Sequence, residues 1–208
     1  MKLKYLWGTV VLVTGIMVFS CSPGAKYERR LKHELASGIR HDSLFMGIYL
    51  GMTDKDFYTR CWNLNREEVI KQGNSNLSVE YEIKEELNYP ATMNFYPVFD
   101  QGKIVEMPVR FIYNGWAPWN KELSSESLSQ DVLSWYQQVY GSGFITVTHP
   151  RRGTAYTKID GNRRITIFTK DDMHVWAVFT DMLAESVLRD STSGAEQIYD
   201  EITEDPAN

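Results

Sequence analysis

Residues 45–57, FMGIYLGMTDKDF, contain three local signals of the fold. The apolar run Phe45–Leu50 has the composition of a β-strand, and Gly51 permits a tight turn after it. Thr53 and Asp56 then resemble a capping box, in which the Thr side chain accepts a hydrogen bond from the first turn of a helix. This stretch therefore predicts a strand, a turn and a capped helix that joins the core.

The chain after this stretch alternates helical and strand patterns. Thr53–Gln72 is interpreted as one kinked helix or as two short helices, because Asn65 and Glu68 form a second capping box. A clear amphipathic stripe predicts a later helix with Leu128, Val132, Trp135, Tyr136 and Val139 on one side. Strand patterns cover residues 77–83, 93–99, 105–113, 144–148, 154–160, 164–169 and 174–179.

Short connections between these strands favour antiparallel pairing. Pro97 and Pro108 lack an amide hydrogen, so each is expected at a sheet edge or a bulge. The sequence therefore predicts an α+β fold of one or more antiparallel sheets. Its helices are expected to pack on one face, with a helix-then-strands order that occurs twice.

The sequence predicts four segments. They are a signal peptide (1–20), a tether with a short helix (21–43), an α+β domain (44–180) and a short helix with an acidic tail (181–208). The domain has two possible halves, 44–114 and 121–180, and the sequence leaves open whether they share one core. Residues 190–208 carry six acidic and no basic residues, a composition typical of a solvated, disordered tail.

The N-terminus has the pattern of a bacterial lipoprotein signal. Lys2 and Lys4 precede an apolar run over residues 5–19, which fits a secretory signal and is short for a membrane span. The run ends in Val18-Phe19-Ser20-Cys21, which resembles a lipobox. The resemblance implies cleavage before Cys21, a diacylglyceryl thioether on its sulfur and acylation of the new amine. An uncleaved anchor and an ordinary signal peptide are the alternatives.

Lipidation of Cys21 would attach the chain to a membrane by more than one acyl chain, which makes anchoring stable. Ser22 is not the aspartate that retains many lipoproteins at the inner membrane, so we expect the periplasmic face of the outer membrane. Cys61 would then be the remaining thiol. Its position on the same helical stripe as Phe57 favours burial over a nucleophilic role.

The order of these features resembles a known group of envelope proteins. A lipobox, then Leu50-Gly51-Met52-Thr53 and Phe57 at the start of a helix, then an antiparallel sheet, is similar to the small periplasmic lipoproteins of the SmpA/OmlA (BamE-like) and β-lactamase-inhibitor-like group. The approach Phe45-x-Gly47-Ile48-x-Leu50-Gly51 also resembles uncharacterised lipoproteins of Bacteroidota. The resemblance implies a helix pair packed on a sheet, and a role in protein–protein contact during envelope assembly or inhibition.

Composition and motifs argue against several functions. The net charge is −5 and no basic run is present, so the chain lacks an electrostatic footprint for nucleic acid. The 4 histidines are scattered without a metal-binding spacing, so no metal or other cofactor is expected. Gly141-Ser142-Gly143 is too short for the nucleophile elbow of hydrolases. We therefore expect a protein without enzymatic activity.

Two groups of residues are candidate binding surfaces. Trp116 and Trp119 lie in the loop Asn114–Asn120, and exposed tryptophans anchor protein interfaces or stack on sugars. The competing interpretation is that both indoles cover the core as a lid. Arginines in neighbouring predicted turns could bind phosphate or carboxylate groups, or could simply be a solvated hairpin end; they are Arg151, Arg152, Arg163 and Arg164.

These features together predict a non-enzymatic interaction module, anchored to the envelope by lipid and bound to an envelope protein. The alternative is a glycan- or lipid-binding lipoprotein that uses Trp116 and Trp119.

Overall fold

The computed structural model describes residues 23–73, 78–149 and 153–190. Its helices are α2 (Pro23–Ala36), α3 (Asp54–Arg66), the 3₁₀ helix η1 (Lys121–Leu123), α4 (Ser125–Tyr140) and α5 (Glu185–Asp190). Its strands are β1 (Lys71–Gln72), β2 (Val79–Ile83), β3 (Ala91–Phe95), β4 (Val98–Asp100), β5 (Lys103–Tyr113), β6 (Ile145–His149), β7 (Gly153–Asp160), β8 (Arg163–Thr169) and β9 (Val175–Asp181). The predicted signal peptide, Cys21 and the acidic residues 191–208 lie outside the described residues.

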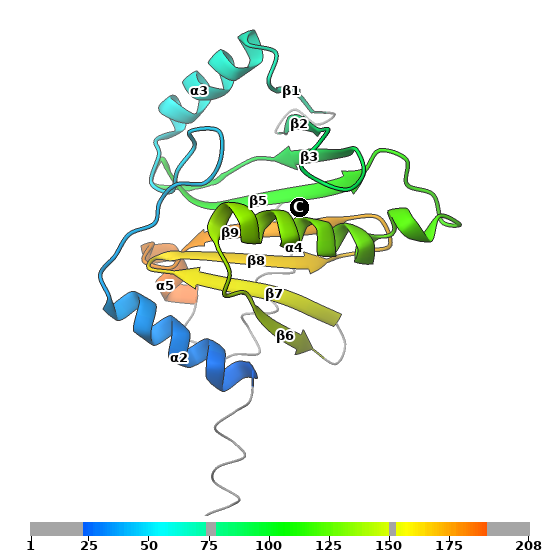
Figure 1. Cartoon of the computed structure of the whole chain (residues 1–208). Coiled ribbons are helices and arrows are strands. Elements are labelled where there is room, and N and C mark those ends of the chain that lie inside the picture. The colour runs from blue at the N-terminus through cyan, green and yellow to red at the C-terminus, as the bar shows by residue number, and fades with distance from the viewer. Residues whose placement is uncertain (1–22, 74–77, 150–152, 191–208) are drawn as a thin grey trace, which may run out of the picture.

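The described strands form one antiparallel sheet (Figure 1). Their order is β1-β2-β3-β5-β9-β8-β7-β6, and β4 pairs with β5 on the side of β3. The pairing of β5 with β9 joins the strands that precede α4 to those that follow it. The predicted α+β fold with antiparallel strands is therefore confirmed, and strands dominate it.

One side of the sheet, named here the first face, carries the hydrophobic core. Alternate residues of each strand point to this face. The core cluster draws on both runs of strands and includes Met93, Met107, Phe111, Ile165, Ile167, Ala177 and Phe179. The two possible halves of the domain therefore share one core.

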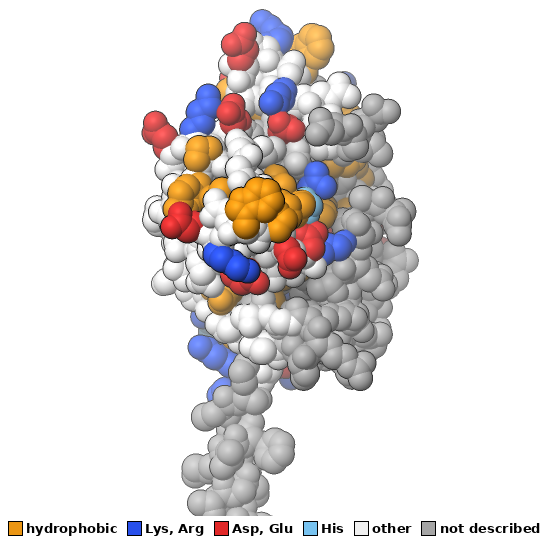
Figure 2. All heavy atoms as spheres, turned by 90° about the vertical axis from the view of Figure 1, so that its right-hand side faces the viewer, with side chains coloured by type: hydrophobic (Ala, Val, Ile, Leu, Met, Phe, Trp, Pro, Cys, Tyr) orange, Lys and Arg blue, Asp and Glu red, His pale blue; other side chains and the backbone are white. Residues whose placement is uncertain are grey.

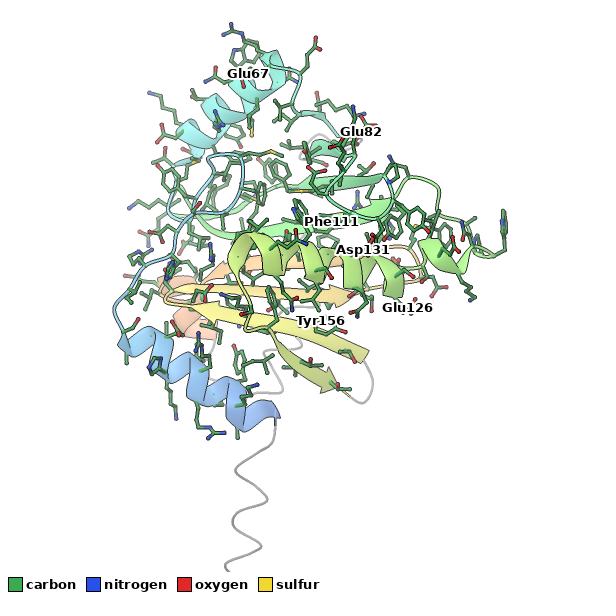
Figure 3. All side chains as sticks on the ribbon, viewed as in Figure 1. Glu67, Glu82, Phe111, Glu126, Asp131 and Tyr156 are labelled. Atoms are coloured by element: carbon green, nitrogen blue, oxygen red, sulfur yellow. The ribbon has the colours of Figure 1, made fainter. Side chains whose placement is uncertain are left out.

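Helix α4 covers the middle of the first face. Three residues of its predicted stripe, Leu128, Val132 and Tyr136, are buried, and the helix contacts β5, β8 and β9. Ser124 caps its first turn. Phe111 lies beneath the helix (Figure 3), and its ring centroid is 6.1 Å from that of Tyr136. The aromatic contacts fix α4 on the sheet.

The expected strand at Phe45–Leu50 is wrong, because the segment folds back on itself. The Ile48 amide donates to the carbonyl of Phe45 at 2.8 Å. Met46 and Gly47 have φ of 52° and 76°, a left-handed conformation that ends an extended strand. The segment nevertheless belongs to the core, since the Ile48 side chain is buried in it.

The turn and the helix start that follow are confirmed. Gly51 has φ of 80°, which only glycine adopts readily. Thr53 Oγ1 accepts a hydrogen bond from the amide of Asp56 at 3.2 Å, and α3 begins at Asp54. Thr53 therefore caps α3 as expected, and its hydroxyl donates to the Asp56 side chain at 2.8 Å.

The second short helix expected after Asn65 is wrong. α3 ends at Arg66, and Glu68 has φ of 58°, so the chain turns away there. Asn65 Nδ2 donates to the carbonyl of Ile70 at 3.0 Å, and this bond holds the turn that leads into β1. The Asn65 side chain therefore closes a turn and does not cap a helix.

The predicted strands correspond to β2–β9, with the second one split. Tyr96-Pro97 separates β3 from β4. Pro108 lies inside β5 opposite Val178 of β9, where the other side of β5 faces the interruption between β4 and β3. Pro108 therefore lies in an interior strand and not at the sheet edge, beside a break in the ladder on one side of β5.

Candidate functional site

The loop of residues 114–120, named here the tryptophan loop, runs from β5 to η1 beside the turn between β8 and β9. Trp116 Nε1 donates to the carbonyl of Asp172 at 2.9 Å and ties the loop to that turn. The Asn120 amide donates to the carbonyl of Ala117 at 2.9 Å, and the Asn120 side chain caps η1. The loop is therefore fixed near its middle and at its end.

The two tryptophans of this loop differ in exposure. The Trp119 side chain is 84% exposed, whereas Trp116 is half-buried. The interpretation of both indoles as a lid on the core is therefore wrong for Trp119. Figure 2 views the molecule from the side where η1 lies and shows hydrophobic side chains projecting at the centre, with charged side chains around them. One indole holds the loop, and the other is presented to solvent.

Carboxylates flank the loop. Asp171 Oδ2 lies 2.8 Å from His174 Nδ1, and Asp171 Oδ1 accepts from the amides of Met173 and His174. Burial would raise the pKa of the Asp171 carboxyl, but these hydrogen bonds outweigh burial and lower the pKa. Glu122 accepts from the Tyr89 hydroxyl at 3.1 Å, which raises the pKa of Tyr89. These groups offer charge and hydrogen-bond acceptors beside the tryptophan loop.

The arginine candidates are not gathered into one site. Arg163 and Arg164 lie in β8 and are buried, so their expected placement in an exposed turn is wrong. Neighbouring strand residues point to opposite faces, so the two guanidinium groups cannot share a patch. Arg163 lies 4.9 Å from the ring centroid of Tyr140. Arg151 and Arg152 lie outside the described residues.

A buried polar network around Asn162 was not predicted. This polar joint consists of Arg40, Asp42, Asn162 and Asp181. Asn162 is fully buried, and its Nδ2 donates to Asp42 at 2.9 Å and to Asp181 at 3.1 Å. Arg40 Nη2 donates to Asp42 at 2.8 Å and to Asp181 at 2.9 Å, and these contacts raise the pKa of Arg40. The joint fixes the N-terminal segment to the sheet. The turn residues around Asn162 signal only a hairpin, so the sequence gives little hint of it.

Helix α3 carries a second exposed aromatic surface, which was not predicted. Tyr58 and Trp62 are 52% and 66% exposed, and the Tyr58 hydroxyl lies 2.7 Å from that of Tyr96. Their i, i+4 spacing beside the buried stripe is the signal in the sequence.

Metal ligands and reactive side chains were sought among the described residues only. These residues contain no group of three or more side chains placed to hold a metal ion. Cys61 is half-buried against the core, and burial raises the pKa of its thiol to about 11. A raised pKa disfavours the thiolate that a nucleophile requires. The buried Lys158 is ion-paired with Asp160.

In the described parts of the chain, no helix has both the length and the apolar character of a membrane span. Comparison with known proteins gave no match: no protein-family model fits the chain, and neither a curated protein nor a solved structure is detectably similar to it.

Proposed function

We propose that the protein is a lipid-anchored, non-enzymatic protein of the cell envelope that binds another envelope protein through the tryptophan loop. The observation that carries this proposal is the exposure of Trp119, at 84%, on a loop held by the hydrogen bonds of Trp116 and Asn120. Burial of the apolar area of an exposed indole is favourable, so binding of a partner over Trp119 would be stabilised by it. Because the loop is already held in place, little conformational entropy would be lost on binding.

The proposed anchor rests on the lipobox-like residues that end at Cys21. Helix α2, which follows directly, lies near β6 and β7, whereas the tryptophan loop extends from the opposite side of the molecule (Figure 1). Attachment at Cys21 would therefore leave the tryptophan loop clear of the bilayer. On this proposal the chain sits at the periplasmic face of the outer membrane.

The proposal includes the finer architecture predicted from the sequence pattern. In it, the helices pack on one face and a helix-then-strands order occurs twice. Support comes from the element order, in which α3 precedes β1–β5 and α4 precedes β6–β9, and from the position of α4 on the first face.

The test is chemical crosslinking in native envelopes, followed by pull-down of the full chain with its anchor intact. Trp119→Ala should reduce the crosslinked partner at least tenfold and leave the melting temperature almost unchanged, because surface substitutions usually change stability by less than about 0.5 kcal/mol. Trp62→Ala is the matched control, since it removes a comparably exposed indole from α3. This control should retain the partner.

If Trp119→Ala crosslinks the same proteins in the same amounts as the unaltered chain, the proposed interface is wrong. A chain that captures no protein at all would overturn the interaction module itself. The alternative is binding of a glycan or lipid, and the carboxylates of Glu122 and Asp171 beside the loop are acceptors that sugar hydroxyls would suit. In that case Trp119→Ala would abolish binding to a glycan array or to lipid vesicles and leave protein crosslinks intact.

A further inference from the structure

Helix α3 carries a diagonal row of four exposed side chains, named here the α3 row. It consists of Asp54, Tyr58, Trp62 and Arg66, which follow one another at intervals of four residues. Side chains at this spacing are neighbours on a helix and form one ridge, which extends for about 18 Å along the helix axis. Tyr58 and Trp62 are 52% and 66% exposed. The α3 row therefore presents two aromatic rings to solvent between a carboxylate and a guanidinium.

The rest of the domain leaves most of the α3 row uncovered. Tyr58 contacts the sheet through its hydroxyl, which lies 2.7 Å from that of Tyr96, and through one side of its ring, 6.4 Å from that of Phe99. Within the described parts of the chain, neither Asp54 nor Arg66 forms an ion pair. Helix α3 also projects beyond the end of the sheet that holds β1 (Figure 1). A large partner can therefore reach the α3 row without meeting the sheet.

The order of its side chains makes the α3 row complementary to itself in the reverse direction. If two copies of α3 lie antiparallel about a two-fold axis, Asp54 of each copy faces Arg66 of the other. The same axis places Tyr58 of each copy against Trp62 of the other. Ridges of this kind pack together in the commonest class of helix contact, with the axes at about −50°. A parallel arrangement about a two-fold axis would instead bring like charges together.

We propose that the protein forms a symmetric, antiparallel dimer through the α3 row, with a second copy of this chain as the occupant. Charge complementarity selects a second copy over an unrelated protein, because each charged end finds its opposite within the row itself. One helix face with two aromatic rings is smaller than the roughly 800 Å² that each partner of a stable complex buries, so the dimer is weak and reversible. The tryptophan loop lies elsewhere, beside η1, and stays free (Figure 1). This inference does not rest on the proposed function.

Sedimentation equilibrium of the full chain in a density-matched detergent, from about 5 µM to about 500 µM, tests this inference. The chain should change from monomer to dimer over that range. Trp62→Ala should weaken dimerisation at least tenfold, because each dimer loses two aromatic contacts. Trp119→Ala is the matched control, since it removes an exposed indole from the tryptophan loop, and it should leave dimerisation unchanged. In envelope crosslinking, Trp62→Ala should lose the second copy and retain the envelope protein, so failures of the two proposals are distinguishable.

Charge reversal tests the antiparallel pairing itself. Asp54→Arg places guanidinium groups at both ends of the row, and Arg66→Asp places carboxylates there. Each variant alone should dimerise at least tenfold more weakly, because like charges then face each other. An equal mixture of the two variants should dimerise as well as the unaltered chain, since every facing pair is again opposite in charge. Glu126→Arg, which reverses a first-turn carboxylate of α4, should have no effect.

The inference is wrong if the unaltered chain stays monomeric up to about 500 µM. It is also wrong if Trp62→Ala dimerises normally, or if the mixed charge variants associate no better than either variant alone. A monomeric chain whose α3 row crosslinks a different envelope protein would assign the row to that protein and contradict the dimer. If Asp54→Arg unfolds α3, which hydrogen exchange in α3 would show, Trp62→Ala decides alone.

Discussion

Helices α4 and α3 both carry aromatic side chains, yet only α4 is packed deeply into the molecule (Figure 1). α4 has 16 residues and buries five of them, Ser125, Leu128, Ser129, Val132 and Tyr136. α3 has 13 residues and buries only Phe57 and Leu64. α4 crosses the central strands, whereas α3 extends beyond the end of the sheet that holds β1. Burial of a helix therefore depends on where its connections place it, as well as on its apolar content.

The first turn of α3 is attached to the sheet, and Arg60 and Leu64 hold its later turns. Thr53 forms a bridge with Lys103, and the Phe57 ring lies 6.0 Å from that of Tyr96 and 5.9 Å from that of Phe99. Elements with few buried contacts open locally at a smaller free-energy cost than the core. We expect α3 to open independently and α4 to open only when the whole domain unfolds.

The largest effect is expected at the buried centre of α4. Tyr136→Ala removes a ring that packs against Phe111, Tyr140 and Phe179. It should lower the free energy of unfolding by about 4 kcal/mol, as for other large aromatic deletions in cores. Urea titration followed by fluorescence measures this. A decrease in the free energy of unfolding of less than about 1 kcal/mol would show that α4 does not hold the core together.

Phe57→Ala makes the corresponding change in α3. The Phe57 side chain is buried, so removal of its ring should lower the free energy of unfolding by about 3 kcal/mol. This value is at the lower end of the range for aromatic deletions, because the site lies at the edge of the core. Hydrogen exchange should show α3 opening at a smaller free-energy cost than β8 and β9, whose amides exchange only on global unfolding. A single opening free energy shared by all three elements would contradict the independence of α3.

The N-caps provide a matched pair of smaller changes. Thr53 caps α3 and Ser124 caps α4, each through a side-chain oxygen that accepts an amide hydrogen bond. Replacement by Ala should cost about 1 kcal/mol in each case. Thr53→Ala should lower the free energy of local opening of α3 as well as that of global unfolding, whereas Ser124→Ala should lower only the free energy of global unfolding. If Thr53→Ala leaves the local opening of α3 unchanged, the contrast between the helices fails.

The smallest effect concerns Cys61 in α3. Burial raises its thiol pKa to about 11, so at pH 8 its thiolate fraction, and hence its reaction with a disulfide reagent, should be about 100-fold below that of a thiol of pKa 9.0. The neutral thiol is favoured in the folded state, so its contribution to stability is complete below pH 9 and is lost as pH rises towards 11. Reaction at the rate of a free thiol at pH 8 would show that α3 is already open.

The amphipathic stripe of α4 and the strands could be predicted because local patterns and burial agree there. Leu128, Val132 and Tyr136 are buried as the stripe indicates, although Val139 is 56% exposed near the end of the helix. Phe45–Leu50 misleads because apolar composition suits a buried turn as well as a strand. The positive φ of Met46, which decides between them, is not signalled by its residue type.

The candidate site could be predicted as a loop but not in its detail. Composition places two tryptophans around Pro118, but only the bond from Trp116 to Asp172 decides which indole is held and which is exposed. That contact joins residues 56 positions apart, which no local pattern reveals. Gly161-Asn162 dominates the local signal and favours a turn that includes Arg163, yet β8 begins at Arg163.

The polar joint has a mechanical consequence. If the chain is pulled at its N-terminus, α2 bears the tension first, because it packs on β6 and β7. Tension that passes α2 reaches Arg40 and Asp42, whose side chains hold Asn162 and Asp181, at the ends of β8 and β9. Both strands are interior to the sheet, so a load at the joint is shared by the ladders on either side of them. The joint is thus a second point of resistance, which would keep the sheet intact after α2 has detached.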